Sequence, residues 1–236
     1  MCCRFLLLQQ HFRELLEKLG LDDAPEFLTR YNIAPGSVIP AVRAGVAARA
    51  AVALRWGLVP SWAKTDDGAK LVNARAETVA EKPSFRDALR KRRCIIPASG
   101  FYEWEHRGQE RLPWLFRRRD GQPFGFAGLW ESWRAPDGAQ LETCTFVTTA
   151  PNELMRPIHD RMPVMLSPGE FDLWLDPGIN DPAQIIPLLH PPAAAELQAC
   201  RVNRRVGNVR YEAPNCLTPA TDDDEDDTPQ LSLGLE

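Results

Sequence analysis

The sequence predicts an α+β fold built on a mainly antiparallel, barrel-like β-sheet with a few short flanking helices. Short runs of β-branched and aromatic residues recur along the chain, whereas helical patterns are few. Gly, Pro and Asp residues bound most of these runs, as they do when strands are joined by turns. The 236 residues include 21 Pro and 7 Trp, a composition that favours a loop-rich architecture over a helical bundle.

Four segments are expected to begin or form helices. Residues 11–20 carry apolar side chains at helical spacing and end at Gly20, which is a common stop signal. Residues 84–92 begin with Ser84 as the expected N-cap residue. Two further helices are expected to begin at Ser167 and Asp181, because a proline suited to the first helical turn follows each of them.

Eight runs are expected to be strands because they are short, apolar or aromatic, and bounded by turn residues. They span residues 38–42, 51–56, 94–98, 101–105, 113–116, 124–130, 143–149 and 162–166. The pairs Asp120-Gly121 and Asp137-Gly138 are typical of hairpin turns. They predict that the strands on either side of each pair lie next to each other.

The chain is expected to consist of one domain at 1–217 and an acidic, disordered tail at 218–236. The tail holds six consecutive acids at 222–227 and few apolar residues. The net charge is −4, yet the residues before 221 contain 28 bases and 25 acids. The bases cluster at 90–93, 117–119 and 201–205. Each cluster alone is interpreted as a solvated face, and together they favour an anionic partner.

The cysteines and histidines do not indicate a metal site. The six Cys form no CxxC pair, and the four His do not fall at zinc-ligand spacings. We therefore expect no metal and no cofactor. No run approaches the length of a transmembrane helix or a signal peptide, so a cytoplasmic protein with reduced thiols and no membrane partner is expected.

The chain opens with MCCRF, which places Cys2 directly after the start residue. If Met1 is removed, Cys2 carries a free α-amine, with a pKa of roughly 7.7–8.0, beside its thiol. A neutral amine attacks an aldehyde to give a Schiff base, and the thiol can then close a thiazolidine ring on the same carbon. The alternative, a terminal cysteine without a role, stays open on these residues alone.

Further motifs carry side chains suited to a site. Asn73 and Arg75 lie two residues apart and would point the same way on an extended segment. They could orient an amine and hold a phosphate. Glu103 lies between aromatic residues, which would raise its pKa and suit acid or base chemistry. His159 has charged neighbours and suits proton transfer.

Two more residues could contact nucleic acid. An exposed Trp62 could stack on an unpaired base, and Arg161 could contact a phosphate or pair with Asp160. Ordinary alternatives remain for every residue taken singly. They are a turn asparagine, a surface arginine, a solvent-facing strand glutamate, a loop histidine and a core tryptophan.

Taken together and in order, these motifs resemble the SRAP family, whose name stands for SOS response-associated peptidase. The likeness covers about residues 1–217 and is carried by RYNIAPG at 30–36, RWGLVPSWAK at 55–64, NARAET at 73–78, RRCIIPASGFYEW at 92–104 and TTAPNELMRPIHDRMPVML at 148–166. The resemblance implies a protein of the DNA damage response that attaches covalently to abasic sites in single-stranded DNA. It also implies the SRAP fold and a nucleoid-associated location when the protein is bound to DNA.

The resemblance also assigns roles. It implies Cys2 as the nucleophile, Asn73 as the residue that positions the α-amine or sugar, and Glu103 and His159 as proton-transfer groups. The expected DNA contacts are Arg4, Trp62, Arg75 and Arg161. The chemistry would be lyase-like, through a Schiff base, with self-processing peptidase activity at the N-terminus. We expect the protein to act as a monomer.

This chain departs from the family pattern at two places, at Cys3 and at RYEAPNCL (210–217), which replaces the usual Asn-Asp-Gly-Pro type of run. Cys3 stands where the family usually has glycine. A side chain there could narrow the site, and a second thiol could compete with the first or oxidise.

Two alternatives to covalent capture stay open. The first is a hydrolase of the N-terminal-nucleophile type, in which the Cys2 thiol attacks an amide and its own α-amine is the base. The second is a non-catalytic single-stranded DNA-binding module held by basic clusters and tryptophans. Binding by such a module would survive Cys2→Ala and weaken steeply with salt.

Overall fold

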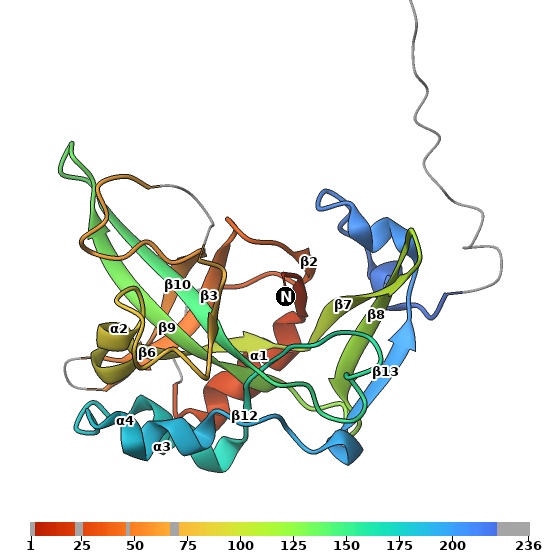
Figure 1. Cartoon of the computed structure of the whole chain (residues 1–236). Helices are drawn as coiled ribbons and strands as arrows, with labels where there is room; N and C mark the ends of the chain where they lie inside the picture. The colour runs from red at the N-terminus through yellow and green to blue at the C-terminus, as the bar shows by residue number, and fades with distance from the viewer. Residues whose placement is uncertain (1–2, 22–25, 46–47, 67–70, 221–236) are drawn as a thin grey trace, which may run out of the picture.

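The computed structural model describes residues 3–21, 26–45, 48–66 and 71–220. Over these residues the chain forms two β-sheets, one of eight strands and one of five, with short helices around them (Figure 1). Most strand pairs are antiparallel, so the predicted α+β class is confirmed.

The larger sheet contains a closed ring of five strands. β3 (Val38–Ala44) pairs with β4 (Arg49–Trp56) and with β6 (Arg93–Ala98). β9 (Phe124–Arg134) pairs with β6 and with β10 (Gln140–Thr149). β10 then pairs with β4, in parallel, and this pairing closes the ring. The predicted barrel-like sheet is therefore present as a small five-stranded barrel.

Three short strands extend this sheet. β5 (Asn73–Arg75) pairs in parallel with β10. β11 (Met162–Pro163) pairs with β10, and β12 (Met165–Leu166) pairs with β9. The loop at 150–161 therefore begins and ends next to β10, which fixes its position at this end of the barrel.

The smaller sheet has the strand order β13-β8-β7-β1-β2. Its members are β1 (Phe5–Leu7), β2 (Arg30–Ile33), β7 (Gly100–Arg107), β8 (Glu110–Arg118) and β13 (Leu197–Arg201), and all neighbours are antiparallel. The N-terminal strand β1 thus lies between β7 and β2. The sequence places residues 3 and 4 directly before this internal strand.

An aromatic core joins the two sheets. Phe5 of the smaller sheet lies 5.4 Å from Trp56 and 5.7 Å from Phe126 of the larger sheet, measured between ring centres. Phe126 in turn stacks on Phe146 at 4.7 Å. All four rings are fully buried, so truncating Phe126 to Ala would cost about 3–5 kcal/mol. Because one core contains residues of both sheets, we propose that residues 1–217 form one domain.

The helices are short and cover the outside of the sheets. They are α1 (Gln9–Lys18), α2 (Arg86–Lys91), α3 (Phe171–Leu175) and α4 (Pro182–Ile185), with 3-10 turns at Pro168–Glu170, Ile186–Leu188, Ala194–Glu196, Arg204–Gly207 and Pro214–Leu217. α1 buries Phe12, Leu15 and Leu16, the face expected from their spacing. Among the described residues, none of the helices is long and apolar enough to cross a bilayer.

Two of the three predicted caps are present. The side chain of Glu170 accepts a hydrogen bond from the N–H of Ser167 at 2.7 Å, as in a capping box. Asp181 accepts from the N–H of Ala183 at 3.0 Å. The prediction for Ser84 was wrong, because the preceding turn continues one residue further. The N–H groups of Phe85 and Arg86 donate to the carbonyl of Lys82, and no side chain caps α2.

One of the two predicted hairpins was also wrong. Asp137-Gly138 joins β9 to β10, which pair as expected. Asp120-Gly121 joins β8 to β9, but these strands belong to different sheets. The turn there sends the chain from the smaller sheet into the barrel. The predicted disordered tail at 218–236 lies outside the described residues from 221 onward.

Candidate functional site

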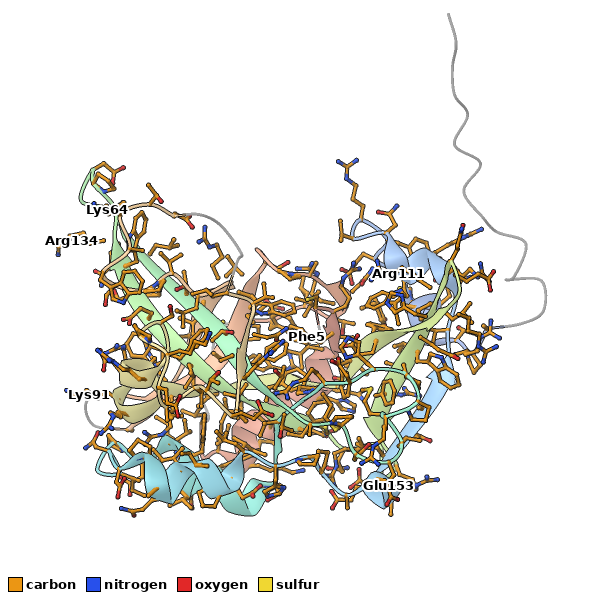
Figure 2. All side chains as sticks on the ribbon, in the orientation of Figure 1. Phe5, Lys64, Lys91, Arg111, Arg134 and Glu153 are labelled. Atoms are coloured by element: carbon orange, nitrogen blue, oxygen red, sulfur yellow. The ribbon has the colours of Figure 1, made fainter. Side chains whose placement is uncertain are left out.

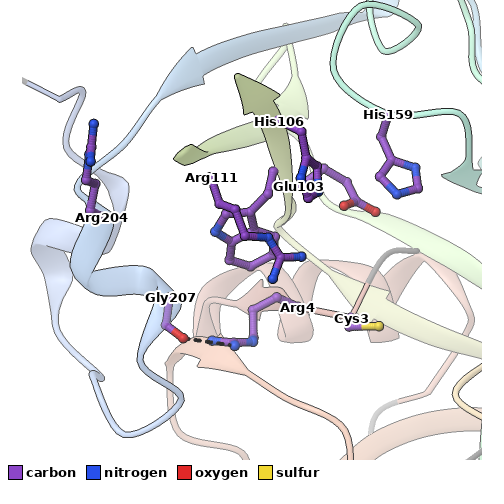
Figure 3. Close-up of a pocket in the computed structure, with 9 residues that line it drawn as sticks. Cys3, Arg4, Glu103, His106, Arg111, His159, Arg204 and Gly207 are labelled. Carbon is purple, nitrogen blue, oxygen red and sulfur yellow. Dashed lines mark hydrogen bonds between the residues drawn. The ribbon is translucent and has the colours of Figure 1, made fainter. Parts of the chain in front are cut away.

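A cavity of about 540 Å³ lies where β1 begins, beside β7. Phe5 of β1 pairs with Phe101 of β7 in an antiparallel register. Continuing this register toward the N-terminus places Cys3 opposite Glu103, and both residues line the cavity (Figure 3). The polar lining also includes Arg4, His106, Arg111 and His159.

Glu103 is held in the cavity by the close packing of β7. Its strand begins at Gly100, where an added Cβ would lie 2.9 Å from the main-chain oxygen of Phe116 on β8. Only glycine permits this approach. Glu103 is 2% exposed, and burial raises the pKa of its carboxyl to about 7. A carboxyl with this pKa is close to half protonated at neutral pH, so it can both donate and accept a proton.

His159 enters the same cavity from the loop that follows β10. The loop is shaped by Asn152, whose side-chain oxygen accepts from the N–H of Met155 at 3.0 Å, while the carbonyl of Met155 accepts from the N–H of His159 at 3.0 Å. In Figure 3 the imidazole ring of His159 points toward the carboxyl group of Glu103. His159, from a loop of the larger sheet, and Glu103, from a strand of the smaller sheet, therefore line the same cavity.

Both protonation states of His159 have a partner at Nδ1. In the neutral ring, Nδ1 accepts from the main-chain N–H of Arg161 at 3.0 Å, which leaves the proton on Nε2. In the charged ring, Nδ1–H can donate to the carboxylate of Asp160 at 3.0 Å. Burial lowers the pKa of His159, so the neutral ring predominates near pH 7. This arrangement suits a group that takes up and releases a proton.

Arg4 forms part of the cavity wall and is mostly bonded within the protein. Its Nη1 donates at 2.8 Å both to the side-chain oxygen of Asn32 and to the carbonyl of Val206. Its guanidinium also lies 5.5 Å from the centre of the Trp104 ring. Arg4 is 8% exposed, so it connects the N-terminal segment to the 3-10 turn at Arg204–Gly207. Its expected contact with DNA stays a prediction.

Arg161 is also bonded within the protein. It forms a bidentate ion pair with Glu77, at 2.6 and 2.9 Å, and donates to the carbonyl of Thr148 at 2.6 Å. This ion pair lowers the pKa of Glu77. The acidic partner of Arg161 is therefore Glu77 of the NARAET motif and not Asp160, the partner considered from the sequence.

Three other expected site residues, Asn73, Arg75 and Trp62, are not part of the cavity lining. Asn73 is the first residue of β5, opposite Phe146 of β10, and its side-chain oxygen is buried. Arg75 ends the same strand and is exposed, and Trp62 is 62% exposed on the turn after β4. Cys2 lies outside the described residues. The roles expected for these four residues stay predictions.

Two cavity residues, His106 and Arg111, were not predicted from the sequence. They lie opposite each other on the hairpin formed by β7 and β8, and both line the cavity. The segment HRGQER centres on a glycine between two strand-like runs, which could have indicated a hairpin and this pairing. Neither residue belongs to a motif that carried the resemblance.

A small barrel joined to a second sheet is an architecture that known proteins share. The family model described as SOS response associated peptidase (SRAP) matches residues 1–209. This chain belongs to the SRAP family.

Named relatives cover most of the chain. It is 40% identical over 222 residues to the abasic site processing protein YoqW of Bacillus subtilis (strain 168), which covers 92% of this chain and 99% of YoqW. It is 33% identical over 191 residues to the abasic site processing protein HMCES of Gallus gallus, covering 70% of this chain and 56% of HMCES.

Solved structures confirm the fold. A protein from Bacteroides thetaiotaomicron superposes with a TM-score of 0.85 at 26% identity, over 93% of this chain and 100% of that one. A protein from Bordetella bronchiseptica gives a TM-score of 0.72 at 29% identity, over 85% and 99%. The two-sheet architecture is therefore that of experimentally determined relatives.

Proposed function

We propose that this protein captures abasic sites in single-stranded DNA through a covalent thiazolidine at Cys2. The observation that carries the proposal is the buried carboxyl of Glu103, with a pKa of about 7, facing His159 in one cavity directly beside Cys3. Relatives at 33–40% identity are named abasic site processing proteins, which supports the same class of substrate for this chain.

The reaction begins with the sugar. An abasic deoxyribose exists mostly as a closed ring, and opening it requires a proton on the ring oxygen and removal of one from the hydroxyl at C1′. Glu103 can exchange both protons because its pKa lies near neutral pH. Ring opening produces the C1′ aldehyde, which is the electrophile for the next step.

The covalent steps then take place at Cys2. After removal of Met1, the neutral α-amine attacks C1′, and the carbonyl oxygen leaves as water after two proton transfers, giving a Schiff base. The thiol sulfur adds to C1′ and its proton passes to the nitrogen, which closes a five-membered ring. His159 can carry the protons between nitrogen and oxygen, since its Nδ1 has a partner in each protonation state.

Cys3 cannot replace Cys2 in this reaction. The nitrogen of Cys3 is part of a peptide bond, so it cannot form a Schiff base. Burial also raises the pKa of the Cys3 thiol, which keeps it protonated near neutral pH. We infer that Cys3 shapes the cavity without supplying the nucleophile.

The remaining residues would hold the DNA. We propose that Arg75 and Arg161 contact the phosphates and that Trp62 stacks on a base. Arg4 would support the cavity and the strand that enters it. Asn73 would position the α-amine or the sugar. The protein would act as a monomer at the nucleoid. Release of its own start residue would be the extent of its peptidase activity.

A denaturing gel tests this proposal. The protein is mixed with a single-stranded oligonucleotide that carries one abasic site, and then denatured fully. A shifted band should form with the native protein and disappear with Cys2→Ala. The same band from an oligonucleotide with intact bases would contradict aldehyde chemistry, and turnover of an amide substrate would favour the hydrolase alternative. Binding that survives Cys2→Ala without a denaturation-resistant band in the native protein would favour the binding module.

A further inference from the structure

The arginines around the cavity differ in whether protein groups already engage them. Arg4 donates to Asn32 and Val206, and Arg204 pairs with Glu110 at 3.1 Å. Arg161, next to His159, is held by a bidentate pair with Glu77. These guanidinium groups have much of their hydrogen-bonding geometry fixed by the fold, so an incoming anion would have to share them.

Arg111 differs from these three. It is exposed on β8 and lines the cavity, yet within the described ranges its guanidinium makes no hydrogen bond and no ion pair. Arg111 lies opposite His106 in the hairpin register, and His106 also lines the cavity (Figure 3). A guanidinium fork and an imidazole thus project from adjacent strands at one wall.

The position of Arg111 is tied to the reacting groups. Burial raises the pKa of Glu103, and the positive charge of Arg111 acts to lower it. The guanidinium is therefore near enough to influence the carboxyl that would open the sugar. An anion held by Arg111 would lie next to the reaction centre, as the phosphates on either side of an abasic sugar do.

We propose that Arg111, assisted by His106, is the binding residue for a phosphate group that flanks the abasic sugar. This inference rests on the proposed function. A guanidinium binds phosphate through two parallel N–H donors, which fixes both position and orientation. An imidazole N–H of His106 adds one further donor from the neighbouring strand. The phosphate anchor would place C1′ within reach of Glu103 and of the N-terminal segment.

The test measures non-covalent binding, so that formation of the covalent adduct does not contribute to the measured affinity. The probe is a single-stranded oligonucleotide with a tetrahydrofuran abasic analogue, which has no aldehyde and cannot form the adduct. Affinity is measured over a series of KCl concentrations for the native protein and for Arg111→Gln, Arg111→Lys and Arg90→Gln. Arg90 is the matched control because it is exposed and lies on α2. Figure 2 shows Lys91 of α2 and Arg111 on opposite sides of the molecule.

Each glutamine variant removes one positive charge, so a difference between them reports a local contact. Arg111→Gln should weaken binding by about tenfold at low salt. It should also reduce the slope of log affinity against log salt by about 0.7, the value for one phosphate contact to a single strand. Arg111→Lys should keep the slope and lose part of the affinity, while Arg90→Gln should leave the slope unchanged.

The inference is overturned if Arg111→Gln and Arg90→Gln have the same affinity and slope. Thermal unfolding of each variant shows whether the substitution has changed the fold, and an exposed arginine should tolerate it. A failure of the proposed function would appear differently, as the absence of adduct between the native protein and an aldehyde-bearing oligonucleotide. The salt slope would still report whether Arg111 binds phosphate.

Discussion

The carboxyl group of Glu103 and the imidazole ring of His159 face each other in one cavity, although one comes from a strand of the smaller sheet and the other from a loop of the larger sheet (Figure 3). Glu103 lies on β7 of the smaller sheet, whereas His159 lies in the loop between β10 and β11 of the larger one. Their approach depends on how the two sheets pack. Cys3 enters the same cavity because β1 lies beside β7.

The first prediction concerns the chemistry of Glu103. Glu103→Gln removes a proton-transfer group and keeps nearly the same shape. We expect the rate of adduct formation at saturating DNA to fall by about a hundredfold or more, with affinity for the tetrahydrofuran oligonucleotide unchanged. Single-turnover kinetics on denaturing gels, measured from pH 5 to 9, would show this. Equal rates for native protein and variant would remove Glu103 from the mechanism.

The second prediction concerns stability. The pKa of Glu103 is raised from 4.5 to about 7 in the folded state. Its stabilising contribution is therefore fully present below pH 4.5 and is lost as pH rises through 7. Glu103→Gln has no such dependence, so its free energy of unfolding relative to the native protein should increase by up to about 3 kcal/mol between pH 5 and 8.

Urea unfolding at the two pH values measures this difference. Glu105→Gln is the matched control, because Glu105 lies on the same strand but pairs with Arg107 and Trp114. A constant difference between the Glu103→Gln variant and the native protein would mean that the carboxyl titrates normally.

The third prediction separates the two neighbouring cysteines. Cys2→Ala should abolish the denaturation-resistant adduct, since only residue 2 can present an α-amine and a thiol on adjacent carbons. Cys3→Ala and Cys3→Gly should retain it, because neither changes the reacting atoms. Adduct yield on a denaturing gel, with intact mass to confirm loss of Met1 in every variant, gives the comparison. Loss of the adduct in Cys3→Gly would show that Cys3 takes part in the reaction.

The fourth prediction concerns Arg4. Arg4→Ala removes hydrogen bonds to Asn32, Val206 and Gly207 in a mostly buried setting. We expect it to lower the free energy of unfolding by about 2–4 kcal/mol. Arg13→Ala, on the exposed side of α1, should change stability by less than about 0.5 kcal/mol. If the two variants unfold at the same urea concentration, Arg4 does not hold the cavity wall together.

Local patterns predicted the local features of this fold well. The Asp137-Gly138 hairpin and the cap at Asp181 depend on a few neighbouring residues, and both are present. The aromatic neighbours of Glu103 left both a buried and a solvent-facing side chain open, and the structure shows it 2% exposed. The barrel-like sheet followed from the number of short strands, although its ring of pairings could not be read from the sequence.

Features that depend on distant segments were not predictable in this way. Arg93 was part of a basic cluster interpreted as a solvated face, yet it is 5% exposed. Its guanidinium donates to the carbonyls of Leu89, Arg90 and Trp174, near the C-terminal ends of α2 and α3. Helix ends leave such carbonyls without partners, but the sequence does not show that two helix ends converge on one arginine.

The same limit applies to the site. Resemblance led to Glu103 and His159, and the packing of the two sheets brings them together. Arg111 was not predicted as a site residue. Its role follows from the register of β7 and β8 and from the ion pairs that the neighbouring arginines form within the protein. The glycine in HRGQER could have indicated the hairpin, but the engagement of the other arginines has no signature within a short stretch of sequence.

The mass of the adduct tests the central claim most directly. An oligonucleotide with one abasic site is incubated with the protein, treated with borohydride, denatured and measured intact. The account predicts the mass of the protein without Met1 plus the oligonucleotide less one water, with no hydrogens added by borohydride, because a thiazolidine resists reduction. An adduct that retains Met1, or one that borohydride reduces quantitatively, would contradict the proposed bond.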